Sequence, residues 1–258
     1  MTAQTNFHKS FQRKVERPSM QSENFVLAAL PPDIYKQLMP HLKQVSLEQG
    51  KLICAPNEPI ETVYFPIDCL LSLTITMNDG STAETGMIGR QDMFGLNAVM
   101  SGTSAQTTCS VQVAGSAFKA DAKIWRQEFN RNQELREVLL RSAQALAAQV
   151  SQTAACNRLH LLDQRLARWL LEVQSRIGND NLKLTHEFIS EMLGVRRAGV
   201  TLAAQKLQDS GIIQYNRGHI KILDQHGLEA SACECFSVIQ QEYDRLLLNQ
   251  NILNQNNR

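Results

Sequence analysis

Polar side chains suited to reading nucleic-acid bases lie in one stretch of the chain, THEFISEMLGVRRAGVTLAAQ, from Thr185 to Gln205. Its second half carries the guanidinium of Arg197, the hydroxyl of Thr201 and the amide of Gln205 at intervals of four residues, which is the spacing of one helix face. Such groups hydrogen-bond to base edges in the DNA major groove, and a guanidinium can pair with guanine O6 and N7 together. We therefore predict that these three side chains read bases, and that Arg196 and Thr185 contact the phosphate backbone.

The apolar residues of the same stretch predict a helix-turn-helix. Ile189 and Leu193 lie four apart on one face of a first helix, and Gly194 is suited to the left-handed turn that ends it. Val195 and Val200 then fill the angle between the two helices. In this motif the N-terminal part of the second helix enters the major groove. An ordinary helical hairpin is the alternative for this window taken alone.

A basic hairpin follows the second helix and predicts a wing. Two β-rich runs, 212–215 and 219–223, flank the turn 216–218, whose asparagine and glycine are expected to take the positive φ of a tight hairpin. Arg217 and Lys221 would contact phosphates from this wing. Between residues 181 and 226 basic side chains outnumber acidic ones by only six to four, so charge alone does not indicate DNA binding.

Composition excludes some classes of protein. The 258 residues have room for about two domains, 43% of them are hydrophobic, and the net charge is +1. No apolar run approaches the ~20 residues of a membrane span, so we expect no membrane partner. The six cysteines are too few for a disulfide scaffold and no secretory signal precedes them, so we expect reduced thiols in a cytoplasmic protein.

Metal and enzyme sites are not predicted. Cys233-Glu234-Cys235 is not the C-x-x-C pair of many zinc sites and no second pair completes it, so buried, inert thiols are the expectation. Asp92, Glu84 and His41 have no spacing that would join them in acid-base catalysis, and we expect each to be a solvated surface residue. We therefore expect no enzyme activity.

The remaining segments predict what positions the DNA-reading stretch. Residues 1–24 are expected to form a disordered arm, although a basic, acid-poor start can also mimic a transit peptide. Short β-rich runs with frequent turns, such as Asn78-Asp79-Gly80, predict an antiparallel barrel or jelly roll within residues 25–130. Residues 131–160 predict one long helix, which either pairs with its twin in a dimer or packs on its own domain. We favour the dimer. Residues 161–230 would form the winged helix domain and 231–258 a helical tail.

This order of parts resembles the CRP/FNR family of bacterial transcription regulators. The residues that carry the resemblance are Gly50, Glu58-Pro59, Val63-Tyr64-Phe65, Asp79-Gly80, Gly89 to Gly95, Leu162 to Leu171 and Gly194 to Val200. The resemblance implies an α+β fold with an N-terminal antiparallel β-roll (jelly roll) and flanking helices, a long dimerisation helix and a C-terminal winged helix-turn-helix. It also implies a homodimer on a near-palindromic operator in double-stranded DNA, with RNA polymerase as a further partner.

The chain departs from the family at two sites. Arg197 stands where the family has a guanine-reading arginine, but Ala198 and Leu202 replace an acidic residue and a second arginine, so the operator should differ. Gly95 is followed by Leu96 in place of the ribose-binding glutamate, and residues 104–109 lack the phosphate-binding arginine. We therefore expect no cyclic AMP or cyclic GMP, and no cofactor. The roll would bind another small effector or none. A winged helix that docks on protein is the competing hypothesis.

Overall fold

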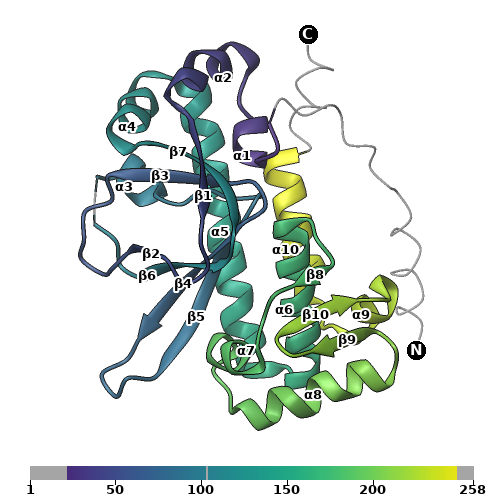
Figure 1. The fold of residues 1–258 in the computed structure, drawn as a ribbon. Helices are drawn as coiled ribbons and strands as arrows, with labels where there is room; N and C mark the ends of the chain where they lie inside the picture. The colour runs from purple at the N-terminus through teal and green to yellow at the C-terminus, as the bar shows by residue number, and fades with distance from the viewer. Residues whose placement is uncertain (1–21, 103, 249–258) are drawn as a thin grey trace, which may run out of the picture.

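The computed structural model describes residues 22–102 and 104–248, and its N-terminal half is a β-roll of two antiparallel sheets (Figure 1). One sheet has the order β1-β7-β3 and the other β2-β6-β4-β5. The predicted hairpin is present, because β4 and β5 pair across the turn that contains Asp79 and Gly80. The strands are β1 (Lys43–Leu47), β2 (Leu52–Cys54), β3 (Thr62–Pro66), β4 (Leu70–Thr76), β5 (Thr82–Ile88), β6 (Thr108–Val113) and β7 (Gly115–Asp121).

Short helices close the roll. They are α1 (Phe25–Ala28), α2 (Pro32–Leu38), α3 (Leu96–Met100) and α4 (Ala122–Arg131), with a 3-10 turn at Met39–His41. Asn24 begins α1: its Oδ1 accepts hydrogen bonds from the backbone N–H of Val26 and Leu27, while its Nδ2 donates to the carbonyls of Pro66 and Asp92. The predicted arm 1–24 lies outside the described residues except for its last three, and Asn24 is fully buried.

Helix α5 (Gln133–Leu159) has 27 residues and runs between the roll and the C-terminal helices (Figure 1). Asn132 begins it by accepting a hydrogen bond from the N–H of Leu135 at 3.0 Å. One face, with Leu135, Val138, Leu139 and Ala145, packs into the core of the roll. On the other face Leu140 and Ala147 are exposed.

The C-terminal domain packs its helix-turn-helix and wing on one helix. Its elements are α6 (Leu162–Ile177), β8 (Asn181–Leu182), α7 (His186–Leu193), α8 (Arg197–Asp209), β9 (Ile213–Asn216), β10 (His219–Ile222) and α9 (Gln225–Ser231). Trp169, Leu170, Ile189 and Val200 are buried in its core. The chain then returns to the roll through α10 (Cys235–Tyr243) and a π-helical turn, Asp244–Leu248, whose Leu246 packs in the core of the roll.

Buried charges join α6 to the roll. Glu172 pairs with Arg168 and, at 3.3 Å, with Arg176, whose Nε lies 3.7 Å from Asp92. Tyr243 donates its hydroxyl to Asp92. The prediction that Asp92 is a solvated surface residue is therefore wrong, since its side chain is covered by α6 and α10. The same prediction is wrong for Glu84, which is 6% exposed. His41 is exposed, as predicted.

No helix in the part of the chain that the structure describes is both long enough and apolar enough to cross a membrane.

Candidate nucleic-acid interface

The helix-turn-helix is built by the local signals that predicted it. Thr185 begins α7, and its Oγ1 accepts a hydrogen bond from the N–H of Phe188 at 3.2 Å. Gly194 ends α7 with a φ of 61°, a left-handed conformation that a side chain would disfavour. Ile189 and Val200 are fully buried in the angle between α7 and α8. The turn therefore fixes the direction in which α8 leaves α7.

The first turns of α8 present an open face. Arg197, Thr201 and Gln205 are all exposed, as are Ala198 and Leu202. The Arg197 side chain is 67% exposed, and one of its guanidinium nitrogens lies 3.5 Å from a Glu187 carboxylate oxygen. The amide of Gln205 donates to Asp209 at 2.7 Å. Both contacts are at the surface, where water competes with them, so either can be exchanged for a contact with DNA at little cost.

Thr201 also contacts His186 on the protein side of α8, and the sequence did not reveal this contact. Its Oγ1 lies 3.1 Å from the carbonyl of Arg197 and 3.1 Å from Nδ1 of His186. His186 is buried and stacks on Tyr215 of β9, with ring centroids 3.9 Å apart. Burial, and then the charge of Arg197, lower the pKa of His186. The neutral imidazole therefore connects the outward face of α8 to the wing.

The wing is a two-residue hairpin, with His219 paired opposite Asn216. The sequence predicts that the asparagine and the glycine of this turn have positive φ. The structure gives it to Arg217 (44°) and Gly218 (85°), so the expectation for Asn216 is wrong. Positive φ is uncommon for a residue with a Cβ. The turn places the Arg217 side chain at the exposed tip, and Lys221 is exposed on β10.

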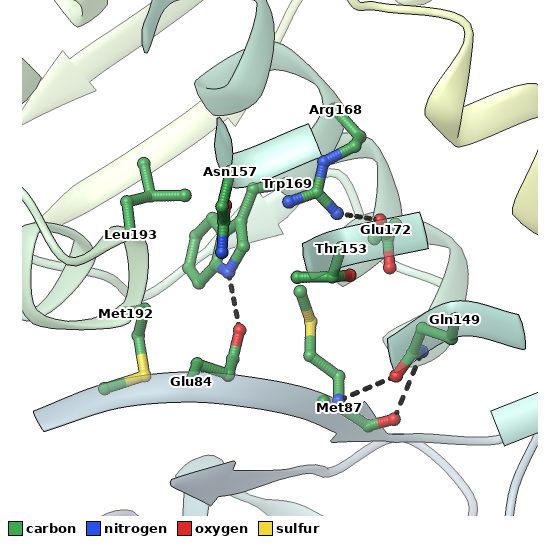
Figure 2. Close-up of a pocket in the computed structure, with 11 residues that line it drawn as sticks. Glu84, Met87, Gln149, Thr153, Asn157, Arg168, Trp169, Glu172, Met192 and Leu193 are labelled. Carbon is green, nitrogen blue, oxygen red and sulfur yellow. Dashed lines mark hydrogen bonds and ion pairs between the residues drawn. The ribbon is translucent and has the colours of Figure 1, made fainter. Parts of the chain in front are cut away.

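A buried carboxylate joins α6 of the C-terminal domain to the roll (Figure 2). Glu84 on β5 accepts hydrogen bonds from Nε1 of Trp169 at 2.9 Å and from the hydroxyl of Ser72 at 2.6 Å. Burial raises its pKa to about 7, although both hydrogen bonds act in the opposite direction. Gln149 of α5 supports the same strand, because its amide bonds both the N–H and the carbonyl of Met87. Roll, long helix and α6 therefore meet at one point.

Two known families match this chain. Residues 164–231 match the Crp-like helix-turn-helix domain and residues 44–132 match the cyclic nucleotide-binding domain. Two global nitrogen regulators are similar to it. One, from Synechococcus elongatus, is 22% identical over 190 residues, which are 69% of this chain and 84% of that protein. The other, from Nostoc sp., is 22% identical over 186 residues, which are 69% and 83%.

Solved structures share the fold. FixK2 from Bradyrhizobium japonicum has a TM-score of 0.64 at 17% identity, over 74% of this chain and 98% of that one. A putative transcriptional regulator of the crp/fnr family from Eubacterium rectale has a TM-score of 0.60 at 23% identity, over 78% and 94%. Since the roll, the helix-turn-helix and their order along the chain all agree, this protein belongs to the CRP/FNR family of transcription regulators.

Proposed function

We propose that this regulator acts as a homodimer that binds a near-palindromic operator, with α8 of each protomer in a major groove. The observation that carries the proposal is the open face of α8, where Arg197, Thr201 and Gln205 are exposed side by side. These three side chains read bases. Arg196, Thr185, Arg217 and Lys221, which are all exposed around this face, contact the phosphate backbone.

The residues beside Arg197 on α8 should influence which base sequence the operator has. Leu202 is 67% exposed and Ala198 is a small exposed side chain, so the contacts beside Arg197 are apolar, as suits a thymine methyl group. Gly199 lies where α8 packs against the start of α6. A Cβ at this position would lie 2.9 Å from Cδ2 of Leu162. The glycine therefore lets α8 cross close to the start of α6, at a cost of about 1 kcal/mol in helix propensity relative to alanine.

Replacing Arg197 by alanine is expected to reduce discrimination between operator and scrambled DNA by roughly 1–3 kcal/mol for each half-site. The lost interaction is the bidentate pairing with guanine, which scrambled DNA does not offer in register. Fluorescence anisotropy titration of operator and scrambled duplexes, at one salt concentration, gives the ratio directly.

Lys221→Ala is the matched control, since it removes one exposed cation from the wing. It should weaken binding to both duplexes equally and reduce the slope of log K against log salt by about one unit. An Arg197→Ala protein that kept the operator-to-scrambled ratio would remove Arg197 from base reading. If the unchanged protein bound neither duplex but captured a protein through Leu202, the alternative of a protein-docking winged helix would replace the proposal.

Helix α5 supports the dimer. Leu140, Ala147 and Ala154 are exposed and seven residues apart, which is the repeat of a helix that pairs with a parallel copy of itself. Sedimentation equilibrium of the full chain at micromolar concentration should give the mass of two chains. Leu140→Glu, which places like charges at the seam, should shift it toward one chain, and Glu134→Gln on the same helix should not. A monomeric parent protein would contradict the dimer.

The residues of the roll do not suit a cyclic nucleotide as effector. Leu96, in place of the ribose-binding glutamate, is buried in the core of the roll, and the segment 104–109 contains no cation that would meet a phosphate. A buried phosphate without a cationic partner is costly, which supports the proposal that cyclic nucleotides do not control this regulator. A different small molecule, or none, would set the spacing of the two DNA-reading helices. A cytoplasmic location and a contact with RNA polymerase follow from the same proposal.

A further inference from the structure

Four metal-ligating side chains meet where α5 ends. Cys156 and His160 lie one helical turn apart at the end of α5, Cys233 lies between α9 and α10, and Cys235 is the first residue of α10. The three sulfur atoms and one ring nitrogen all lie within 4.8 Å of one another. Cys156 Sγ is 3.5 Å from Cys233 Sγ, and Cys235 Sγ is 3.4 Å from His160 Nδ1. The fold thus supplies the second pair that the sequence did not reveal.

These separations suit a single tetrahedral ion. With Zn–S bonds of about 2.3 Å, tetrahedral geometry puts ligand sulfurs about 3.8 Å apart. Three thiols with one imidazole form a common ligand set of structural zinc sites, and the soft sulfur ligands select against magnesium and calcium. The three cysteines are buried, so the set is closed rather than open to substrate.

The surroundings of the cluster match those of a zinc ligand set. The other ring nitrogen of His160, Nε2, lies 3.4 Å from a carboxylate oxygen of Glu234, as in the carboxylate–histidine pairs that orient zinc-bound imidazoles. Gln152 donates to Cys235 Sγ at 3.1 Å. Three thiolates around Zn²⁺ leave one negative charge. Arg165 and Arg168 on α6 lie close enough to interact electrostatically with Cys156 and Cys233, and the Nε of each arginine has no hydrogen-bond partner among the described residues.

We propose that Cys156, His160, Cys233 and Cys235 bind one Zn²⁺ ion that joins the end of the long helix to the start of α10. Each thiol gives its proton to solvent as its Zn–S bond forms, and no electrons are transferred. The site spans the bend at His160 and Leu161 between α5 and α6, so the ion fixes how the DNA-binding domain leaves the long helix.

The test uses the full chain, reduced, stripped with a chelator and returned to Zn²⁺ alone. We expect one zinc per chain by mass spectrometry of the metal, and a higher thermal unfolding temperature with zinc than without. Alkylation mapped by peptide mass spectrometry should show Cys156, Cys233 and Cys235 protected only with zinc, while Cys54, Cys69 and Cys109 react equally in both states. Co²⁺ in place of zinc should give the visible bands of a tetrahedral thiolate site. These measurements need no variant.

Variants give the second line of evidence. Cys233→Ser should lose the bound zinc, and Glu234→Gln should keep the site but lower its zinc affinity roughly 10–100-fold. Cys54→Ser is the control, because a serine hydroxyl can make the same contacts to the carbonyls of Ala55 and Glu58. Less than a tenth of an equivalent of zinc in the unchanged chain, zinc retained by Cys233→Ser, or iron with inorganic sulfide in the purified protein would each overturn the proposal.

Discussion

Replacing Glu172 by glutamine is expected to lower the free energy of unfolding by about 3–5 kcal/mol. Its carboxylate lies between two arginines, Arg168 and Arg176, and the side chains of all three are at most 1% exposed. Glutamine keeps the shape but removes the negative charge, which leaves Arg168 without its paired carboxylate and Arg176 with only the longer 3.7 Å contact to Asp92. Breaking a buried pair in this way costs far more than its formation contributes, because the surviving charges stay desolvated.

Urea denaturation followed by circular dichroism measures the effect. Glu137→Gln is the matched control, since Glu137 lies on the exposed face of α5 and should change stability by less than about 0.5 kcal/mol. Adding Arg168→Met to Glu172→Gln should recover part of the loss, because it removes one of the two uncompensated charges. Equal stabilities for the Glu172 variant and its control would show that the buried arginines are balanced in another way.

The parts of the fold that could be predicted are those determined by residues close together in the sequence. The turn at Gly194, the hairpin at Gly80 and the 27-residue helix each depend on residues close together in sequence, and all were predicted within a few residues. The outward face of α8 follows from helical periodicity alone, so Arg197, Thr201 and Gln205 were placed correctly at the surface. Whether they read bases stays a prediction.

Features made by distant segments could not be predicted. Glu84 and Asp92 look like ordinary surface carboxylates in sequence, and only the packing of α6 and α10 buries them. The wing turn was misjudged for a different reason. Asparagine adopts positive φ more readily than most residues with a Cβ, but Asn216 is paired with His219 in the strand ladder, so the positive φ falls on Arg217. Cys156 and Cys233 are 77 residues apart, so no spacing rule joins them.

Glu84 should make the stability of the protein depend on pH. Its pKa is about 7 in the folded chain, where burial disfavours the carboxylate, against 4.5 for the free side chain. Between these values the folded protein holds a proton that the unfolded chain has released. The stabilising contribution is therefore complete below about pH 4.5 and is lost as the pH rises to about 7, in total roughly 3 kcal/mol.

Glu84→Gln should remove this dependence, because an amide stays neutral at every pH in the range. Its oxygen can still accept from Trp169 Nε1, and its NH2 can donate to Ser72. Gln112 lies 3.4 Å from the carboxylate, and its own Oε1 has no hydrogen-bond partner among the described residues, so a turned amide could accept from the new NH2 group. Above pH 7 the variant should therefore be more stable than the parent protein, by up to about 3 kcal/mol.

Urea denaturation of parent and variant at half-unit steps from pH 4.5 to 8 isolates the effect, since all other titrating groups are shared and cancel in the difference. The two free energies should lie closest at the acidic end and diverge as the pH rises. Glu61→Gln, at an exposed position on the roll, should stay parallel to the parent over the whole range. A Glu84 variant that also stayed parallel would mean that this carboxylate keeps its charge in the folded protein. Trp169 and Ser72 would then be stabilising an anion, and the contact that Glu84 makes with α6 would involve a charged rather than a neutral carboxyl group.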